Sequence, residues 1–273
     1  MIDKLSEGYN KLKNNAERVM DSVKNIGNLS VSKVKQLPYV YPCDNYLDNI
    51  LSNALVRDTV NRLVDKYSNV QVETIRQYAE KVNIKNYPRF WETFDTCCQI
   101  LNVEKRPDIY ITDRNKSINA ITLSVDDSSL ILFTKNSLNV LTDGELKFLI
   151  GHELGHYIQG NLKCHTLKAM LTKLNKKTDV LGSLLTDTIE VPLNDWYRCA
   201  EYTADRAGLL CCKDIKVVES LFSKVAMPCF ETTALADYYE LNMDHPTIKN
   251  RIKELKSYYK EKFISDRMIY KRS

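Results

Sequence analysis

The sequence predicts a mostly α-helical α+β fold that contains one small antiparallel sheet. Over most of the chain, apolar residues recur at steps of three and four, the spacing of a helix with one buried face. Between residues 109 and 134 the pattern changes to short runs of β-branched and aromatic residues, which are typical of strands. The composition, 44% hydrophobic and 27% charged with few glycines and prolines, is that of an ordinary globular domain.

The first segment predicts an amphipathic helix over residues 2–26, because its apolar residues follow a heptad pattern up to Gly27, a residue type that commonly ends helices. We expect this helix to dock on the body of the protein. The alternatives are self-association as a short coiled coil and a helix lying on a membrane surface, and the mixed charges of the polar face disfavour the latter. A polar link then indicates a boundary, with an N-terminal helix and linker at 1–36 and the main domain at 37–273. The heptad positions are Ile2, Leu5, Tyr9, Leu12, Ala16, Val19, Val23 and Ile26.

The main domain is expected to begin with helices and then to form the sheet. Apolar spacing predicts helices within residues 44–64, at Val72–Val82 and at Arg89–Leu101. Turn clusters at Asp113–Asn115 and Asp126–Ser128 separate the strand runs that follow, so we expect an antiparallel meander. The predicted strands are Ile109–Ile111, Ile118–Val125 and Leu130–Thr134.

Thr142 and Glu145 have the spacing of a capping box, which predicts the start of a helix that runs to about Gln159. Residues 162–190 are amphipathic and rich in lysine, which is typical of an exposed helix and a loop. The same spacing predicts the last helices, with a break at His245–Pro246 before the final one. They run from about Pro192 through Cys212, at Ile215–Val225, at Ala234–Leu241 and at Ile248–Phe263.

Composition and charge exclude several classes of function. The net charge of +4 is small and the lysines are spread along the chain, so we expect no nucleic-acid partner. No run approaches 18 apolar residues and the N-terminus has no apolar signal core, so neither an integral membrane span nor secretion is expected. We therefore expect a soluble, cytoplasmic protein. Its eight cysteines are expected to be reduced and mostly buried, because secretion is not indicated and neighbouring cysteines, as at 97–98 and 211–212, cannot easily bridge each other. Neither pair forms a CxxC motif.

Residues 152–156, His-Glu-Leu-Gly-His, carry the strongest chemical signal. Histidines four residues apart on a helix lie on one face, so both rings can bind one Zn²⁺ ion. Glu153 is offset around the helix and can act as general base on a water at the metal without binding the metal itself. The alternative is a pair of helix histidines that happen to flank a glutamate, which the rarity of the pattern disfavours. The sequence thus predicts His152 and His156 as zinc ligands.

A catalytic zinc site needs a third protein ligand and one open position. One zinc-peptidase subclass would place a histidine six residues after His156, but that position is Leu162. Glu201 and Asp205 lie four residues apart on a later predicted helix, among small residues that permit close helix packing. We expect Glu201 to be the third ligand and Asp205 to accept the outer N–H of a ligating histidine. The small residues are Ala200, Ala204 and Ala207.

HELGH at 152–156 together with EYTAD at 201–205 resembles the HtpX-like and CAAX-prenyl-endoprotease-like zinc peptidases, the gluzincin-type peptidase family forty-eight. The resemblance covers roughly residues 40–258 and implies a zincin-like metallopeptidase domain with an HExxH helix and one Zn²⁺ per chain. Membrane-embedded members carry transmembrane helices, some of them between these two motifs. Residues 157–200 are too polar for such helices, so the resemblance implies a soluble, stand-alone member. Other stretches that resemble the family are Pro42–Asp44, Asn119–Ala120, Ile131–Leu141, Asp143–Leu146, and His245–Pro246 with Arg251–Ile252.

The implied activity is that of a metalloendopeptidase, which hydrolyses peptide bonds in protein or peptide substrates through a zinc-activated water with Glu153 as general base. The substrate is expected to lie extended along the edge strand at Asn119 and Ala120. An oxyanion donor is also needed. His245 is the first candidate and Arg251 or Tyr202 the alternatives, while Arg206 is expected to brace the site through a carboxylate.

Two other interpretations remain open at this stage. One is a zinc-binding regulatory or interaction protein without proteolytic activity, which would use residues 2–26 to dock a partner. Glu153 disfavours it, because a structural zinc site needs no general base and usually has four protein ligands. The other is a membrane-associated peptidase that is held at a lipid surface by the N-terminal helix.

Overall fold

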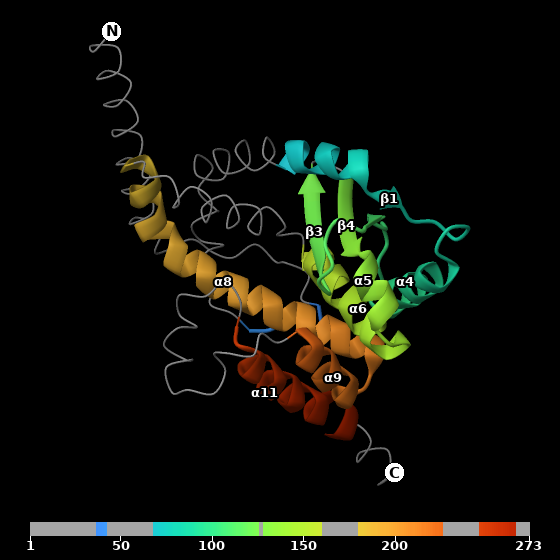
Figure 1. The fold of residues 1–273 in the computed structure, drawn as a ribbon. Helices are drawn as coiled ribbons and strands as arrows, with labels where there is room; N and C mark the ends of the chain where they lie inside the picture. The colour runs from blue at the N-terminus through green and yellow to red at the C-terminus, as the bar shows by residue number, and fades with distance from the viewer. Residues whose placement is uncertain (1–36, 43–67, 126–127, 160–179, 226–245, 266–273) are drawn as a thin grey trace.

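The computed structural model describes five stretches of the chain, which are mostly helical and include one four-stranded sheet (Figure 1). The prediction of a mostly helical α+β fold is confirmed for these residues. The predicted helices within 1–36, 44–64 and 234–241 lie outside the described residues, as does His245. The division of the chain at residue 36 stays a prediction. The described stretches are residues 37–42, 68–125, 128–159, 180–225 and 246–265.

Helices begin at side chains that satisfy their first backbone N–H groups. The hydroxyls of Thr134 and Thr247 each accept a hydrogen bond from the backbone N–H three residues later, which starts α5 and α11. The helices are residues 68–78, α4 (Pro88–Ile100), α5 (Lys135–Val140), α6 (Asp143–Gln159), α8 (Val180–Cys212), α9 (Ile215–Val225) and α11 (Ile248–Tyr259), which continues as a π-helical turn at Lys260–Ser265. The strands are β1 (Glu80–Lys81), β2 (Asp108–Thr112), β3 (Ala120–Val125) and β4 (Ser128–Thr134).

The sheet is mixed, so the prediction of a purely antiparallel sheet is wrong. Its strand order is β1-β2-β4-β3, with β2 and β4 parallel and the other pairs antiparallel. After β2 the chain does not form the neighbouring strand but continues to the outer edge of the sheet, where it forms β3. β4 then returns between β2 and β3, and therefore runs in the same direction as β2. Among the described strands, β3 pairs with β4 alone and has one unpaired edge.

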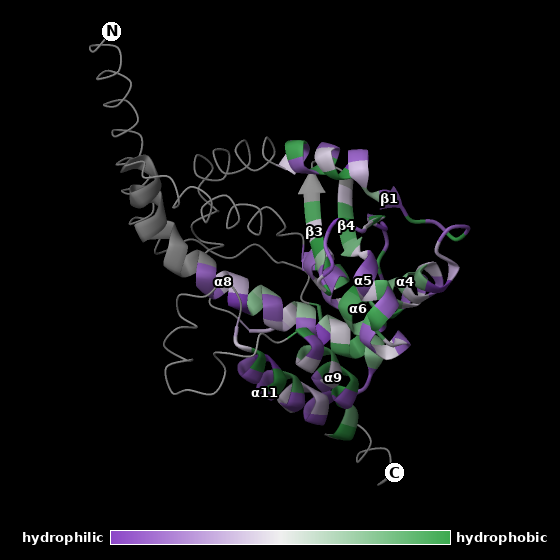
Figure 2. Cartoon of the chain, in the orientation of Figure 1, coloured by the Kyte–Doolittle hydropathy of each residue, from purple (hydrophilic) through white to green (hydrophobic). Residues whose placement is uncertain are grey.

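Side chains of the sheet alternate between two apolar clusters, one on each face. Ile109 and Ile131, which are register partners, pack with α4 and α6. Tyr110 and Leu132, the next pair, face the other side and pack with Ile75 of helix 68–78. Both strands are therefore apolar on both faces, and β3 and β4 are mostly green in Figure 2, whereas α11 alternates between purple and green.

α6 and α8 pack so closely that their backbones touch. A Cβ atom on Gly155 would lie 2.8 Å from the Cα atom of Ala204, and one on Gly151 would lie 2.9 Å from the Cα atom of Gly208. Neither position has room for a side chain. The small residues of the two helices face each other along this interface, which we call the glycine and alanine seam. The side chains beside the seam, including Glu201, therefore lie close to α6.

Several helix limits differ from the sequence predictions for identifiable reasons. α8 begins at Val180, so Pro192, expected near its start, lies inside it, although proline usually marks the first turn of a helix. The first described helix ends at residue 78, where Glu80 and Lys81 pair with β2 instead of extending the helix. α5 was not predicted, while α4, α6 and α9 match their predicted limits within one residue.

The cysteines differ in part from the expectation that all are reduced. Cys97, Cys98, Cys211 and Cys212 are free, and the first three are buried. Cys199 is disulfide-bonded, so the expectation is wrong for this residue. The sequence spacing excludes a bridge within each adjacent pair, but it carries no information on a bridge to a distant cysteine. Within the described residues, no helix has the length and apolar composition of a membrane span.

Candidate metal centre

The start of α6 is held by the predicted capping box. The backbone N–H of Thr142 donates to Oε2 of Glu145 over 2.8 Å, and the backbone N–H of Glu145 donates back to the Thr142 hydroxyl over 3.4 Å. Lys224 and Ser220 of α9 also donate to the Glu145 carboxylate, over 2.7 and 2.8 Å. Burial alone would raise the pKa of Glu145, but these hydrogen bonds lower it to about 2. The helix that carries the histidines is thus anchored by an ionised, buried carboxylate.

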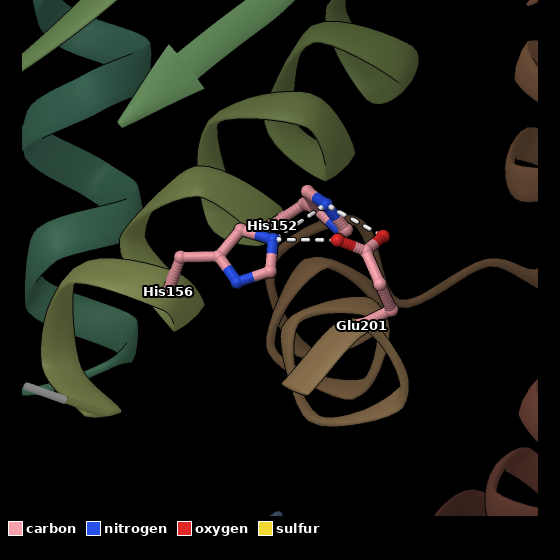
Figure 3. A group of neighbouring side chains, drawn as sticks. All are labelled: His152, His156 and Glu201. Carbon is pink, nitrogen blue, oxygen red and sulfur yellow. Dashed lines mark hydrogen bonds and ion pairs between the residues drawn. The ribbon is translucent and has the colours of Figure 1, made fainter. Parts of the chain in front are cut away.

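His152, His156 and Glu201 converge on one point between α6 and α8 (Figure 3). The Nε2 atoms of the two histidines are 3.1 Å apart, and the Glu201 carboxylate oxygens lie 3.3 Å from His156 Nε2 and 3.7 Å from His152 Nε2. A tetrahedral zinc ion with bonds of 2.0–2.1 Å would separate its ligand atoms by about 3.3 Å. With one ligand atom from each residue, the three atoms lie within 4.8 Å of one another, which is close enough for all of them to bind one such ion.

This group is buried, with Glu201 only 2% exposed. A carboxylate with so little access to water is costly unless a cation or several donors neutralise it. Two imidazole nitrogens and one carboxylate oxygen are also the donor set of catalytic zinc sites that keep one open position. No other group of three His, Cys, Asp or Glu side chains with this spacing occurs in the part of the chain that the structure describes.

Asp205 holds the ring of His152 from behind. Its carboxylate can only accept, so Nδ1 of His152 carries the proton and donates to it over 3.0 Å. Arg251 of α11 donates to the same carboxylate through Nε and Nη2, over 2.7 and 2.5 Å. The structure thus brings Asp205 to the outer nitrogen of a predicted ligand, and it adds Arg251 as the partner that neutralises Asp205.

These contacts shift the pKa values of the buried groups. Burial disfavours the charged form of Asp205, but the charge and hydrogen bonds of Arg251 outweigh it and hold the pKa of Asp205 below its usual value. Burial likewise disfavours protonated His152, and the hydrogen bond to Asp205 and the charge of Glu201 outweigh it, so that its pKa is raised. The site therefore attracts positive charge at this ring.

Glu153 lies next to the ligands and is oriented by the sheet. Its Oε2 atom accepts a hydrogen bond from the Thr122 hydroxyl over 2.5 Å, and the same hydroxyl lies 3.3 Å from the Glu153 backbone oxygen. Both residues are buried. Thr122 belongs to β3, so the edge strand fixes the position of the expected general base. Sequence reasoning did not identify Thr122, because a threonine in a strand is too common to indicate function.

Comparison of the sequence with models of known protein families gives one match that contains these residues. The sequence model described as "Peptidase family M48" matches residues 86–259, more than half of the chain. The chain belongs to peptidase family M48. The match contains the metal group, by which we mean His152, His156 and Glu201. It also contains the residues that hold this group and Glu153 in place, namely Thr122, Asp205 and Arg251, and it begins after helix 68–78.

Two further proteins are similar to this M48 chain. The plastoglobule-localized metallopeptidase 48 of the Arabidopsis thaliana chloroplast is 36% identical over 152 residues, which make up 54% of this chain and 41% of that relative. The chain therefore spans less than half the length of that protein. The crystal structure of Ste24p from S. mikatae superposes with a TM-score of 0.49 at 14% identity, over 93% of this chain and 64% of that one.

The M48 metal group opens into a cleft of about 600 Å³. His152, Glu153, His156 and Glu201 form part of its wall, next to the edge strand β3. A second part of the wall is apolar and comes from two helices. It consists of Phe148 and Leu149 of α6 and of Leu221, Phe222 and Val225 of α9.

The residues predicted to contact substrate belong to the wall of this cleft. Asn119 and Ala120 both line it, at the start of β3. The backbone of Asn119 is fixed there, since its N–H donates to the Ser137 hydroxyl over 3.0 Å and its oxygen accepts from the Thr134 N–H over 3.0 Å. Tyr197, four residues before Glu201 on α8, also lines the cleft. Its spacing from Glu201 could have indicated this in advance.

The remaining predicted site residues have other partners. Arg251 lines the cleft, but its guanidinium is bound to Asp205. The ring of Tyr202 packs against Tyr41, 4.8 Å away. His245, the first candidate for the oxyanion donor, lies outside the described residues. Arg206 pairs with Glu254 of α11 and lies over the rings of Tyr41 and Tyr258, so it connects α8 to α11 and to residues 37–42.

Proposed function

We propose that this chain is a zinc-dependent endopeptidase that cleaves peptide bonds in peptide or protein substrates. The observation that carries the proposal is that the ligand atoms of His152, His156 and Glu201 lie within 4.8 Å of one another at the wall of a cleft that Glu153 also lines. Membership of peptidase family M48 supports it, as does the likeness to a chloroplast metallopeptidase.

The donor set supports zinc as the metal, one ion per chain. Two histidines and one glutamate suit zinc in a hydrolytic site better than the hard cations, which prefer oxygen ligands alone. When bound, zinc supplies a Lewis acid that polarises a carbonyl oxygen and lowers the pKa of water. Asp205 and Arg251 keep the ring of His152 in the tautomer and orientation that such binding requires.

The chain's own residues supply the proton transfers. Glu153 takes a proton from the attacking water and passes it to the leaving amine, because its carboxylate lies beside the ligands without being one of them. Thr122 holds that carboxylate in place through its hydrogen bond. We propose His245 as the donor that stabilises the oxyanion, as expected from the sequence.

The substrate is proposed to bind as an extended strand along the unpaired edge of β3. This edge borders the cleft, and its backbone N–H and C=O groups can pair with a peptide. Asn119 and Ala120 are at the start of that edge. The backbone N–H and oxygen of Asn119 are both bonded on the β4 side, so Asn119 fixes the start of the edge, and the outward-facing backbone groups of Ala120 can pair with the peptide.

The test combines metal analysis with peptide cleavage on the full chain. Zinc content and cleavage of a peptide library would be measured for the wild type, Glu153→Gln, Glu201→Ala and Glu92→Gln. Glu92 is an exposed residue of α4 and serves as the matched control for loss of one carboxylate. We expect one zinc in wild type, Glu153→Gln and Glu92→Gln, cleavage by wild type and Glu92→Gln only, and loss of both zinc and cleavage in Glu201→Ala.

The other outcomes distinguish the alternatives. Wild type that binds no zinc would contradict the metal site. Wild type that binds zinc in the His152, His156 and Glu201 site but cleaves no peptide would favour a zinc-binding regulatory or interaction protein. Cleavage that persists in Glu153→Gln would contradict the role of Glu153 as general base.

A further inference from the structure

We propose that helix 68–78 forms the second side of the substrate site, where it contacts every second side chain of an extended substrate, namely those that point away from the metal group. The inference rests on the proposed function and adds a specificity surface to it. The helix lies against the sheet face opposite to α6, beside the strand that borders the cleft.

One face of this helix belongs to the same cleft as the metal ligands. Gln71, Thr74, Ile75 and Tyr78 all line it, and their spacing of three, four and seven residues places them on one side of the helix. The guanidinium of Arg114 lies 4.0 Å from the centre of the Tyr78 ring, which holds the ring at its outer side. A continuous stripe of the helix is thus presented to whatever occupies the cleft.

The edge strand shows which side chains face this stripe. Thr122 of β3 points toward α6, where it contacts Glu153. Leu123, the next residue, packs with Ile75 on the opposite face. Ile121 is on that same face, paired with Leu132, and it is 48% exposed although it lines the cleft. An exposed isoleucine beside an unpaired strand edge is an apolar surface that a bound peptide would cover.

A peptide that pairs with the free edge of β3 extends the sheet and keeps its alternation. Its side chains therefore point in turn toward α6 and α9, on the side where His152, His156 and Glu201 lie, and toward helix 68–78 on the other side. The second set meets Ile121, Ile75 and Tyr78, so apolar and aromatic side chains are favoured there.

The helical part of this surface lies outside the part of the chain that matches the family, whereas Ile121 lies inside it. The match to family M48 begins at residue 86 and includes the metal group, β3 and α9, but not helix 68–78. The metal side of the cleft is thus the family's, whereas the opposite side is contributed by a preceding segment of this chain. We infer that residues 71–78 tune which substrates this chain accepts without altering its metal site.

The experiment introduces charges on both sides of the cleft and determines at which substrate positions the residue preference changes. Zinc-loaded full-length variants would cleave a randomised peptide library, and the cleavage sites would be mapped by mass spectrometry. Thr74→Lys and Thr74→Glu alter the stripe at an exposed position, and Val225→Lys alters the wall on α9. Gln77→Lys is the matched control, because Gln77 is exposed on the same helix and is not part of the cleft wall.

Thr74→Lys should increase the preference for acidic residues by about two- to fivefold, and Thr74→Glu should do the same for basic residues. Both effects should occur at substrate positions an odd number of residues away from those that Val225→Lys affects. Gln77→Lys should cleave as wild type does, and the zinc content should be equal in all of them.

Two results would overturn the inference while leaving the proposed function intact. The first is that wild type cleaves peptides but the Thr74 variants show the same substrate preferences as Gln77→Lys. The second is an effect of Thr74 and Val225 variants at the same substrate positions, since it would mean that both residues face one side of the peptide. A wild type that cleaves no peptide, as Glu153→Gln is expected to behave, would contradict the proposed function and this inference with it.

Discussion

His152 and Asp205 are 53 residues apart in the sequence, and their side chains meet at 3.0 Å in the interface between α6 and α8. Asp205 is itself held by Arg251 from α11. Three helices therefore determine the orientation of one imidazole ring. A metal ligand must be both deprotonated at the binding nitrogen and correctly aimed, so we expect this contact to link the packing of the fold to metal affinity at the proposed site.

Asp205→Asn is expected to weaken zinc binding by about 10- to 100-fold, because the amide keeps the shape of the side chain but loses the charge that Arg251 and His152 both contact. Affinity would be measured by competition with a chromophoric chelator at neutral pH. The matched control is Asp195→Asn on the same helix, where the carboxylate is exposed and pairs with Arg198. Equal affinities in the two variants would contradict the role of Asp205.

Thr122→Val should lower kcat by about tenfold or more and leave zinc affinity unchanged, since it removes a hydrogen bond to a charged group that is not a metal ligand. Thr122→Ser keeps the hydroxyl and should retain most of the activity. The two variants would be compared by steady-state kinetics together with the chelator competition. A loss of zinc in Thr122→Val, or an equal loss of kcat in Thr122→Ser, would show that the threonine acts through packing instead.

Gly155→Ala should reduce both the free energy of unfolding and zinc affinity, because the added methyl group would meet the backbone of Ala204 at 2.8 Å and push α8 away from α6. The expected destabilisation is about 1–3 kcal/mol. Gly144→Ala is the matched control on the same helix, because its added methyl group would meet only the side chain of Val217, at 3.1 Å. Urea unfolding and chelator competition would test both. If the two variants behave alike, the close contact at Gly155 does not control the site.

Glu145 predicts a specific pH dependence of stability. Its pKa is lowered to about 2 in the folded protein from 4.5, so the ionised carboxylate stabilises the fold at pH values above 4.5, and this contribution is lost as the pH falls toward 2. Glu145→Gln should therefore be less stable than wild type by roughly 2–3 kcal/mol at neutral pH, and the difference should shrink below about pH 5. Urea unfolding at a series of pH values would measure it, with the exposed Glu92→Gln as control. A difference that is independent of pH would contradict the assignment.

Local patterns in the sequence predicted the parts of the structure that depend on neighbours along the chain. The spacing of His152 and His156, and that of Glu201 and Asp205, each describes one face of one helix, and the structure brings these two faces together. The capping box at Thr142 is local in the same sense and is confirmed. In each case the residues that define the feature are within four positions of one another.

Features that depend on distant pairing could not be predicted in this way. The alternation in β2 and β4 identifies strands, but it does not distinguish an antiparallel neighbour from a parallel one, so the strand order was missed. The hydrogen bond from Thr122 to Glu153 and the contribution of helix 68–78 to the cleft both join segments that no spacing rule connects. The position of Pro192 inside α8 shows a third limit, since a helix can continue through a residue whose local preference is against it.

From the same division between near and distant residues we expect an order in which the proposed site assembles as the chain folds. Once α6 forms, its two histidines are already one turn apart, so a weak bidentate metal site is available early. Glu201 arrives only when α8 docks along the glycine and alanine seam, and that docking has to close a long stretch of intervening chain. We therefore expect full affinity for a metal ion at the proposed site only with the native helix pair, and rapid metal exchange in a partly folded chain.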